Sequence, residues 1–187
     1  MKAFAWAMAA LAALGTARAD TLLSADFQNG SSAGWVALGQ GDVGLSTYAA
    51  NVSLRIGANG AAMTALPTLG YAEVTVTVAF AASALGPGGA CVADASNDGG
   101  GTWNEAYRIG PGQDDAVTLH AGGRTLAAMA NQVKVILRLR TVSANAAAAC
   151  WADNIRVSAR PAVATASAAA FGPDGKRVAM DAATLRD

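Results

Sequence analysis

The sequence predicts an all-β protein, an antiparallel β-sandwich in which two sheets pack face to face. Several segments alternate apolar and polar residues with a period of two, as half-buried strands do. Turn signals rich in Gly, Asn and Pro separate these segments at intervals of about 8–12 residues, a spacing typical of sandwiches and barrels. No long stretch with the apolar period of a helix interrupts the series.

The first nineteen residues are typical of a cleavable secretory signal peptide. Lys2 supplies a positive charge, residues 3–14 form an apolar run, and Ala17 and Ala19 occupy the two positions that a signal peptidase reads. The run is well short of the roughly 20 residues that a membrane-spanning helix needs, which favours cleavage over the alternative of a membrane anchor. We therefore expect a secreted or periplasmic chain that begins at Asp20 and contains no transmembrane segment.

The mature chain would hold 168 residues, which is 187 minus 19, and that length suits one domain with a core. Removal of Lys2 and Arg18 leaves 11 of the 13 basic residues against 13 acidic ones, a net charge near −2. No basic patch with interleaved aromatic residues is visible in the sequence. We therefore expect no nucleic acid partner.

Two segments show the alternation most clearly. Residues 71–80 and 134–142 each place Val, Leu or Phe on one face of a strand and polar residues on the other. In our interpretation the polar residues of both strands line one sheet face and include Tyr71, Glu73, Thr75, Arg138 and Arg140. This face is either a platform for a glycan chain or a solvated surface with cross-strand Glu–Arg pairs.

The remaining elements are shorter. Residues 151–157 predict a strand with Trp151, Ile155 and Val157 on one face. Further strands are expected at residues 22–27, 35–38, 52–56, 90–96, 104–109 and 116–120, and one helical turn at residues 125–130. The sandwich domain therefore covers residues 20–160. The Ala-rich tail at residues 161–187 has too few large apolar residues for a core, and we expect it to be disordered or to add one hairpin.

Cys91 and Cys150 are the two cysteines of the chain. Export would place them in an oxidising compartment, where a disulfide is the default state of such a pair. A zinc site would need further ligands, and a redox site would need a CxxC motif. We expect the two cysteines to pair, which requires the strands that they begin to lie within reach of one another.

The segment from Ser96 to Trp103 resembles the Asp box, a hairpin motif with the pattern S-x-D-x-G-x-T-W. The matching residues are Ser96, Asp98, Gly100, Thr102 and Trp103. In sialidases and related propellers the box is structural and repeats once per blade, whereas this chain has one copy. We expect the Asp98 carboxylate to accept backbone N–H groups across the turn, and Trp103 to cover it.

Three further stretches resemble secreted jelly-roll modules, which include MAM-like domains and calcium-containing carbohydrate-binding modules. Residues 26–35 are similar to their opening strand, residues 127–140 to their penultimate region, and residues 150–157 to their closing strand. The resemblance spans residues 22–160. It implies a sandwich of jelly-roll type, with the first and last strands side by side, and a glycan or cell-surface protein as the partner.

The same resemblance implies a structural calcium ion. In the calcium-containing relatives, carboxylates and backbone carbonyls of the first and last strands hold it, and the matching positions here are Asp26, Gln28 and Asp153. Gln28 stands where those relatives usually carry Glu, and calcium prefers anionic oxygen ligands. The alternative is that Asp26 and Asp153 accept hydrogen bonds from the local backbone.

Catalytic patterns are missing from the sequence. His120 is the only histidine, and no Ser-His-Asp or Cys-His arrangement is recognisable. Glu73 with Asp94 across a sheet is a conceivable pair of carboxyls for glycoside hydrolysis, which needs a separation of about 5 Å in a retaining enzyme, but nothing in the sequence selects it. We therefore expect a non-catalytic binding module for glycan or cell-surface material. The alternatives are a structural or adhesive component that binds proteins, and a hydrolase with an unrecognised site.

Overall fold

The computed structural model describes residues 18–48, 50–162, 170–171 and 177–178. The expected signal peptide lies outside the described residues except for its last two positions. Most of the expected tail at residues 161–187 lies outside them too. Within the tail, β12 (Ala170–Phe171) pairs with β13 (Arg177–Val178) in an antiparallel ladder. The described residues contain no helix that is long and apolar enough to cross a membrane.

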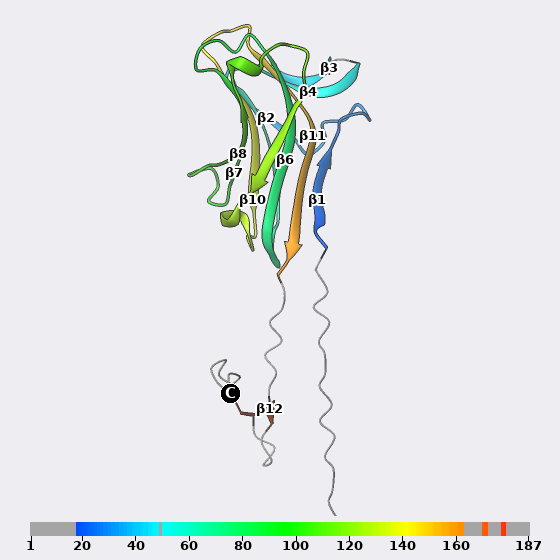
Figure 1. Ribbon diagram of the computed structural model, residues 1–187, viewed down its shortest axis with the longest axis vertical. Helices are drawn as coiled ribbons and strands as arrows, with labels where there is room; N and C mark the ends of the chain where they lie inside the picture. Colours follow the sequence, from blue (N-terminus) through cyan, green and yellow to red (C-terminus); the bar gives the residue numbers. More distant parts are fainter. Residues whose placement is uncertain (1–17, 49, 163–169, 172–176, 179–187) are drawn as a thin grey trace, which may run out of the picture.

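The described chain between Asp20 and Pro161 forms two antiparallel sheets that pack face to face (Figure 1). The six-stranded sheet has the order β3 (Val43–Tyr48), β4 (Asn51–Gly57), β11 (Ala149–Pro161), β6 (Tyr71–Ser83), β9 (His120–Thr125), with β1 (Asp20–Ala25) also paired to β11. The five-stranded sheet has the order β2 (Val36–Gly39), β5 (Gly60–Leu66), β10 (Val135–Val142), β7 (Ala90–Ser96), β8 (Asn104–Ile109). Two short 3-10 turns complete it, η1 (Pro111–Gln113) and η2 (Ala127–Met129). The predicted β-sandwich is confirmed.

The core lies between the two sheets and follows the period-two pattern of the long strands. From β6, Val74, Val76 and Phe80 are buried, and from β10, Leu137 and Leu139 are buried. Their strand neighbours point away from the core, as pleating requires. The faces predicted for these two strands are therefore confirmed, and each sheet presents its polar residues on its own outer side.

Three strands differ from the sequence prediction. β3 and β5 were not expected, because β5 is mostly Gly and Ala without clear alternation and β3 alternates only at Val43 and Leu45. β9 covers residues 120–125 rather than the predicted 116–120. Its central Gly122 is unusual for a strand, but a Cβ atom there would overlap the ring of Tyr107. Glycine is therefore needed for close packing at this point of the sheet.

The face predicted for Trp151 is wrong. A β-bulge interrupts the β11–β6 ladder between Asp153 and Arg156, where Asn154 has a φ of +51°. The extra residue reverses the alternation, so Ala152 and Ile155 both face the core. Trp151 instead lies on the outer side of the six-stranded sheet, where its ring centroid is 5.1 Å from that of Tyr48.

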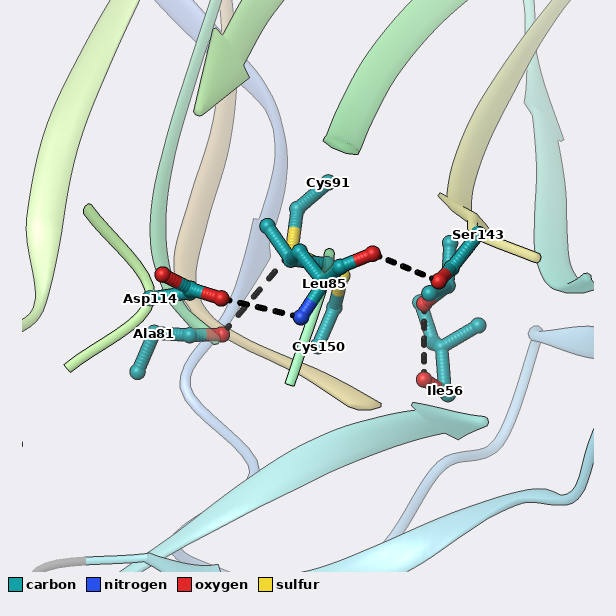
Figure 2. Close-up of a disulfide and its surroundings, with 8 residues drawn as sticks. Ile56, Ala81, Leu85, Cys91, Asp114, Ser143 and Cys150 are labelled. Atoms are coloured by element: carbon teal, nitrogen blue, oxygen red, sulfur yellow. Dashed lines mark hydrogen bonds between the residues drawn. A yellow bond between two sulfur atoms is a disulfide. The ribbon is translucent and has the colours of Figure 1, made fainter. Parts of the chain in front are cut away.

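The predicted disulfide between Cys91 and Cys150 is confirmed, with a Cα–Cα distance of 5.8 Å. It joins β7 of one sheet to β11 of the other, so it crosses the core rather than linking neighbouring strands. Figure 2 shows Leu85 beside the bridge, and its backbone N–H donates to Asp114 Oδ2 at 2.9 Å. Ser143 Oγ donates to the Leu85 carbonyl oxygen at 2.7 Å. These contacts fix the loop that covers this end of the core.

Candidate functional site

The outer face of the five-stranded sheet is the candidate functional site. Ile136, Arg138 and Arg140 of β10 point away from the core, because Leu137 and Leu139 between them are buried. The strand register sets Arg138 between Met63 of β5 and Asp94 of β7. We call this surface the outer face.

A buried carboxylate organises the outer face. The Asp94 side chain is only 2% exposed, and it accepts two hydrogen bonds from Arg138, from Nε to Oδ1 at 2.8 Å and from Nη2 to Oδ2 at 2.7 Å. Arg140 Nε donates to Oδ2 of the same carboxylate at 3.0 Å. A bidentate Arg–carboxylate pair has a defined geometry, so the Arg138 guanidinium is oriented before any ligand arrives, and one hydrogen bond attaches Arg140 to the same carboxylate.

Trp103 adds an aromatic ring to this cluster. The Cζ atom of Arg138 lies 3.5 Å from the centroid of the Trp103 ring, a cation–π arrangement. The other partner of the ring is the hairpin itself, because a Cβ atom on Gly100 would come within 3.3 Å of it. Sequence reasoning assigned Trp103 to the turn alone. Its place on the outer face depends on the pairing of β7 with β10, which the sequence does not reveal.

The hairpin that carries Trp103 is closed by Asp98. The Asp98 carboxylate accepts hydrogen bonds from the Thr102 N–H at 2.9 Å, from Thr102 Oγ1 at 2.7 Å and from Ser96 Oγ at 2.7 Å. Gly99 and Gly100 have positive φ angles, which the tight turn requires. The hydrogen bonds from Thr102, followed by that from Ser96, hold the pKa of Asp98 well below its ordinary value.

We expect Asp98→Ala to lower the melting temperature by several degrees at pH 7, because the turn loses the three hydrogen bonds that the Asp98 carboxylate accepts. A depressed pKa stabilises the fold above the ordinary Asp pKa, and this stabilisation is lost as the pH falls through the folded-state pKa. The difference in melting temperature between Asp98→Ala and the wild type should therefore become smaller as the pH falls below the ordinary Asp pKa. Thermal melts from pH 7 to pH 2 measure it. Asn97→Ala is the uncharged control, and an equal pH dependence for both variants contradicts the assignment.

An apolar groove runs beside the charged cluster. Val36 and Leu38 of the edge strand β2 are 62% and 45% exposed, unusual for large apolar side chains in neighbouring positions. The groove has a volume of about 490 Å³ and is lined by Gly34, Val36, Leu38, Met63, Thr64, Ala65, Lys134 and Ile136. Sequence analysis missed these residues, because an apolar residue on an outer face has the same pattern as one in the core.

The structure does not bring the five predicted ligand residues together. Tyr71, Glu73 and Thr75 lie on β6 in the six-stranded sheet, whereas Arg138 and Arg140 lie on β10 in the five-stranded sheet. The polar residues of each strand point away from the shared core, so the two groups occupy opposite outer sides of the sandwich. The prediction of one common face is wrong.

The first group of these residues has local partners. Tyr71 Oη donates to Asp20 Oδ2 at 3.1 Å, and Glu73 forms an exposed ion pair with Arg160 at 3.2 Å. The Thr75 and Thr125 hydroxyls lie 2.7 Å apart. Glu73 and Asp94 belong to different sheets, so the one pair of carboxyls considered for hydrolysis does not form.

Asp26 and Asp153 lie near one another, as the resemblance implies for first and last strands. Asp26 directly follows β1, whose Ala25 pairs with Ile155 of β11 (Figure 1). The Asp153 carboxyl is buried and accepts the N–H of Asn154 at 2.7 Å. Burial, and then the charge of Asp26, raise the pKa of Asp153 above its ordinary value.

Gln28 acts as a hydrogen-bond donor at this position. Its Nε2 donates to the carbonyl oxygens of Asp26 at 2.8 Å and Val52 at 2.9 Å. A calcium ion would need such oxygens as ligands, together with more than two carboxylates or their equivalents. The described residues contain no cluster of three or more His, Cys, Asp or Glu side chains that could hold a metal ion. Calcium at this position stays a prediction.

Asp153→Asn separates the two accounts of this site. The raised pKa of Asp153 means that the folded state disfavours its ionised form. The contribution of Asp153 to the free energy of unfolding is therefore greatest below the ordinary Asp pKa, and it falls as the pH rises through the raised pKa. Without a cation, we expect the variant to melt at or above the wild-type temperature at pH 7. The measurement is a thermal melt of both proteins with chelator and with millimolar calcium. If calcium raises the melting temperature of the wild type but not that of Asp153→Asn, the ion binds here. At a hundredfold excess over its dissociation constant, bound calcium would add about 2.7 kcal/mol to the free energy of unfolding.

No protein-family model matches the sequence, and no curated protein matches it significantly. Solved structures resemble its fold. The CBM22-1 xylan-binding domain of Xyn10C from Paenibacillus barcinonensis matches with a TM-score of 0.54 and 19% identity, over 79% of this chain and 99% of that one. The xylan-binding module CBM15 matches with a TM-score of 0.54 and 15% identity, over 78% and 99% of the two chains.

A third similar structure is the K3 cleaved adhesin domain of Lys-gingipain from Porphyromonas gingivalis. Its TM-score is 0.52 at 13% identity, and the match covers 75% of this chain and 99% of that one. At these identities the likeness shows the β-sandwich fold and nothing finer.

Proposed function

We propose that this chain is an exported, non-catalytic module that binds a glycan on the outer face of the five-stranded sheet. Export rests on the signal peptide expected at residues 1–19 and agrees with the buried disulfide. The observation that carries the binding assignment is the exposed apolar groove beside a fixed polar cluster. Apolar walls with a few positioned polar groups are the usual composition of a ligand site.

The similar structures support this proposal at the level of the fold. Two of them are xylan-binding modules by name, and both are covered almost completely by the match. The groove lies along strands, and an open groove of this kind accommodates a linear chain rather than a small enclosed ligand. The hydrolase alternative loses its only named pair of carboxyls, because Glu73 and Asp94 lie in different sheets.

Binding of the mature protein to a panel of soluble and insoluble polysaccharides tests the function. We expect retention by at least one of them, and loss of this retention in Leu38→Asp, which places a charge in the groove. Leu38 is 45% exposed, so the substitution should leave the fold intact. Val117→Asp is the matched control, because Val117 is 72% exposed and does not line the groove. Equal binding by both variants would show that the groove is not the site.

An adhesive, protein-binding role is the second candidate, and the edge strand β2 favours it. Its four residues are all exposed, and its free edge is able to pair with a strand from another chain. Short edge strands, however, are one of the devices by which proteins limit such pairing. Light scattering of the mature protein distinguishes the candidates. Strand pairing between copies of the chain predicts dimers, which Leu38→Asp would dissociate. Glycan binding predicts a monomer.

A further inference from the structure

Positive charge is concentrated on the outer face. The mature chain has a net charge near −2, with 11 basic and 13 acidic residues once Lys2 and Arg18 are removed from the 13 basic ones. The strands of the outer face and the residue before β10 instead carry four cations against two anions. The cations are Lys134, Arg138, Arg140 and Arg108, and the anions are Asp94 and Glu105. The hairpin that carries Trp103 adds Asp98, so the surplus on this face is one positive charge, and Arg140 and Lys134 are the cations there that are not fully paired.

Arg140 is the first of these two cations. The Asp94 carboxylate is already bound bidentately by Arg138, and it receives from Arg140 only the Nε bond at 3.0 Å. Within the described residues, no hydrogen bond uses the two Nη nitrogens of Arg140. The side chain is 29% exposed against 18% for Arg138, so these nitrogens are the accessible part of the cluster. The Nη edge of this guanidinium, which Asp94 holds through Nε, is thus available to an anionic oxygen pair.

Lys134 is the second of these cations. It is exposed, it lines the apolar groove, and it forms no ion pair within the described part of the chain. Lys134 precedes β10 and Arg140 lies six positions further along the strand. Because each strand residue advances about 3.4 Å, the two cations stand roughly 20 Å apart along β10, with Lys134 in the groove and Arg140 beyond its end. Ile136 lies between them, next to Ala65 of β5.

We propose that the ligand of this face is an acidic polysaccharide, a claim that rests on the proposed glycan-binding function. A carboxylate of a uronic acid unit accepts hydrogen bonds from the Nη nitrogens of Arg140, and a second carboxylate further along the chain pairs with Lys134. The C–H surfaces of the sugar rings lie against Val36, Met63 and Ile136 in the groove. Asp94 does not contact the ligand; it holds the Arg140 guanidinium in position.

The test compares polygalacturonate with the same polymer after reduction of its carboxyl groups to alcohols, and with neutral xylan. Binding is measured by affinity electrophoresis and calorimetry at two salt concentrations. We expect the mature protein to bind polygalacturonate, to lose at least about tenfold in affinity on carboxyl reduction, and to bind more weakly at high salt. The Arg140→Gln variant should lose at least about the same tenfold in affinity for polygalacturonate. Arg140→Lys should recover only part, because it keeps the charge without the planar fork.

Two further variants keep the test decisive. Lys134→Gln removes an exposed cation that has no ion-pair partner among the described residues, so it weakens polygalacturonate binding without any effect on folding. Arg160→Gln is the matched control, since Arg160 pairs with Glu73 on the other sheet and is 56% exposed. Affinity that falls equally in Arg140→Gln and Arg160→Gln would reflect charge in general and overturn the proposal. Binding of neutral xylan alone would overturn it and leave the proposed function standing. Binding of no polysaccharide at all would remove both.

Discussion

Replacement of both Cys91 and Cys150 by alanine is expected to lower the free energy of unfolding by about 4 kcal/mol. The bridge joins residues that are 59 positions apart, so its removal releases a long loop in the unfolded chain. Both cysteines are fully buried and cross the core from β7 to β11. No other disulfide joins the two sheets, since the chain has two cysteines.

Urea unfolding of the double variant, of the oxidised wild type and of the wild type with reductant measures this effect. The reduced wild type is the control for the two alanine side chains, because it loses the crosslink and keeps the sulfur atoms. We expect the reduced protein and the double variant to unfold at similar urea concentrations, both well below the oxidised protein. A double variant within about 1 kcal/mol of the oxidised wild type would mean that the crosslink adds little to this core.

The strand faces that sequence reasoning assigned correctly are those of β6 and β10, whose burial differs on their two sides. Val74, Val76 and Phe80 alternate with polar residues because one side of β6 faces the core and the other faces water. β9 has no such contrast, and its Gly122 is explained by the Tyr107 ring, which belongs to another strand. The bulge at Asn154 is equally invisible in the sequence, and it moved Trp151 to the outer side.

The composition of the candidate site was predicted only in part for a related reason. Alternation identifies which side of a strand is buried, but it does not say which strands share a sheet. Glu73 and Arg138 have the same pattern and the right charges to pair across a sheet, and they lie on opposite sides of the sandwich. The partner of Arg138 is Asp94, which has an outward position on β7 and is nevertheless buried beneath two arginines.

Asp94→Ala is expected to lower the free energy of unfolding by about 3 kcal/mol, the lower end of the usual cost of removing one partner from a buried ion pair. The carboxylate is 2% exposed, whereas the two guanidinium groups are 18% and 29% exposed. Water therefore solvates part of each arginine that the substitution leaves unpaired, which keeps the loss below that of a fully buried pair.

Glu105→Ala is the matched control on the same face. Glu105 binds Arg108 at 2.8 Å, but these two side chains are 42% and 46% exposed. An exposed pair of this kind contributes about 0.2–1 kcal/mol, because solvent screens it and both side chains lose rotamer freedom. Chemical denaturation of the two variants at pH 7 makes the comparison, since both remove one carboxylate from a strand of the five-stranded sheet.

The comparison also tests whether the buried Asp94 carboxylate holds Arg140 in position. If the Asp94 carboxylate is buried, Asp94→Ala should lose much stability and Glu105→Ala should lose little. Equal losses would mean that the cluster is as solvated as a surface pair and that Arg140 is not held in place by it. In that case the guanidinium of Arg140 would have to be ordered on binding, at a cost of about 0.5–1.5 kcal/mol for one side chain. The preorganised edge that the outer face offers to an anionic ligand therefore depends on Asp94 remaining buried and bound to both arginines.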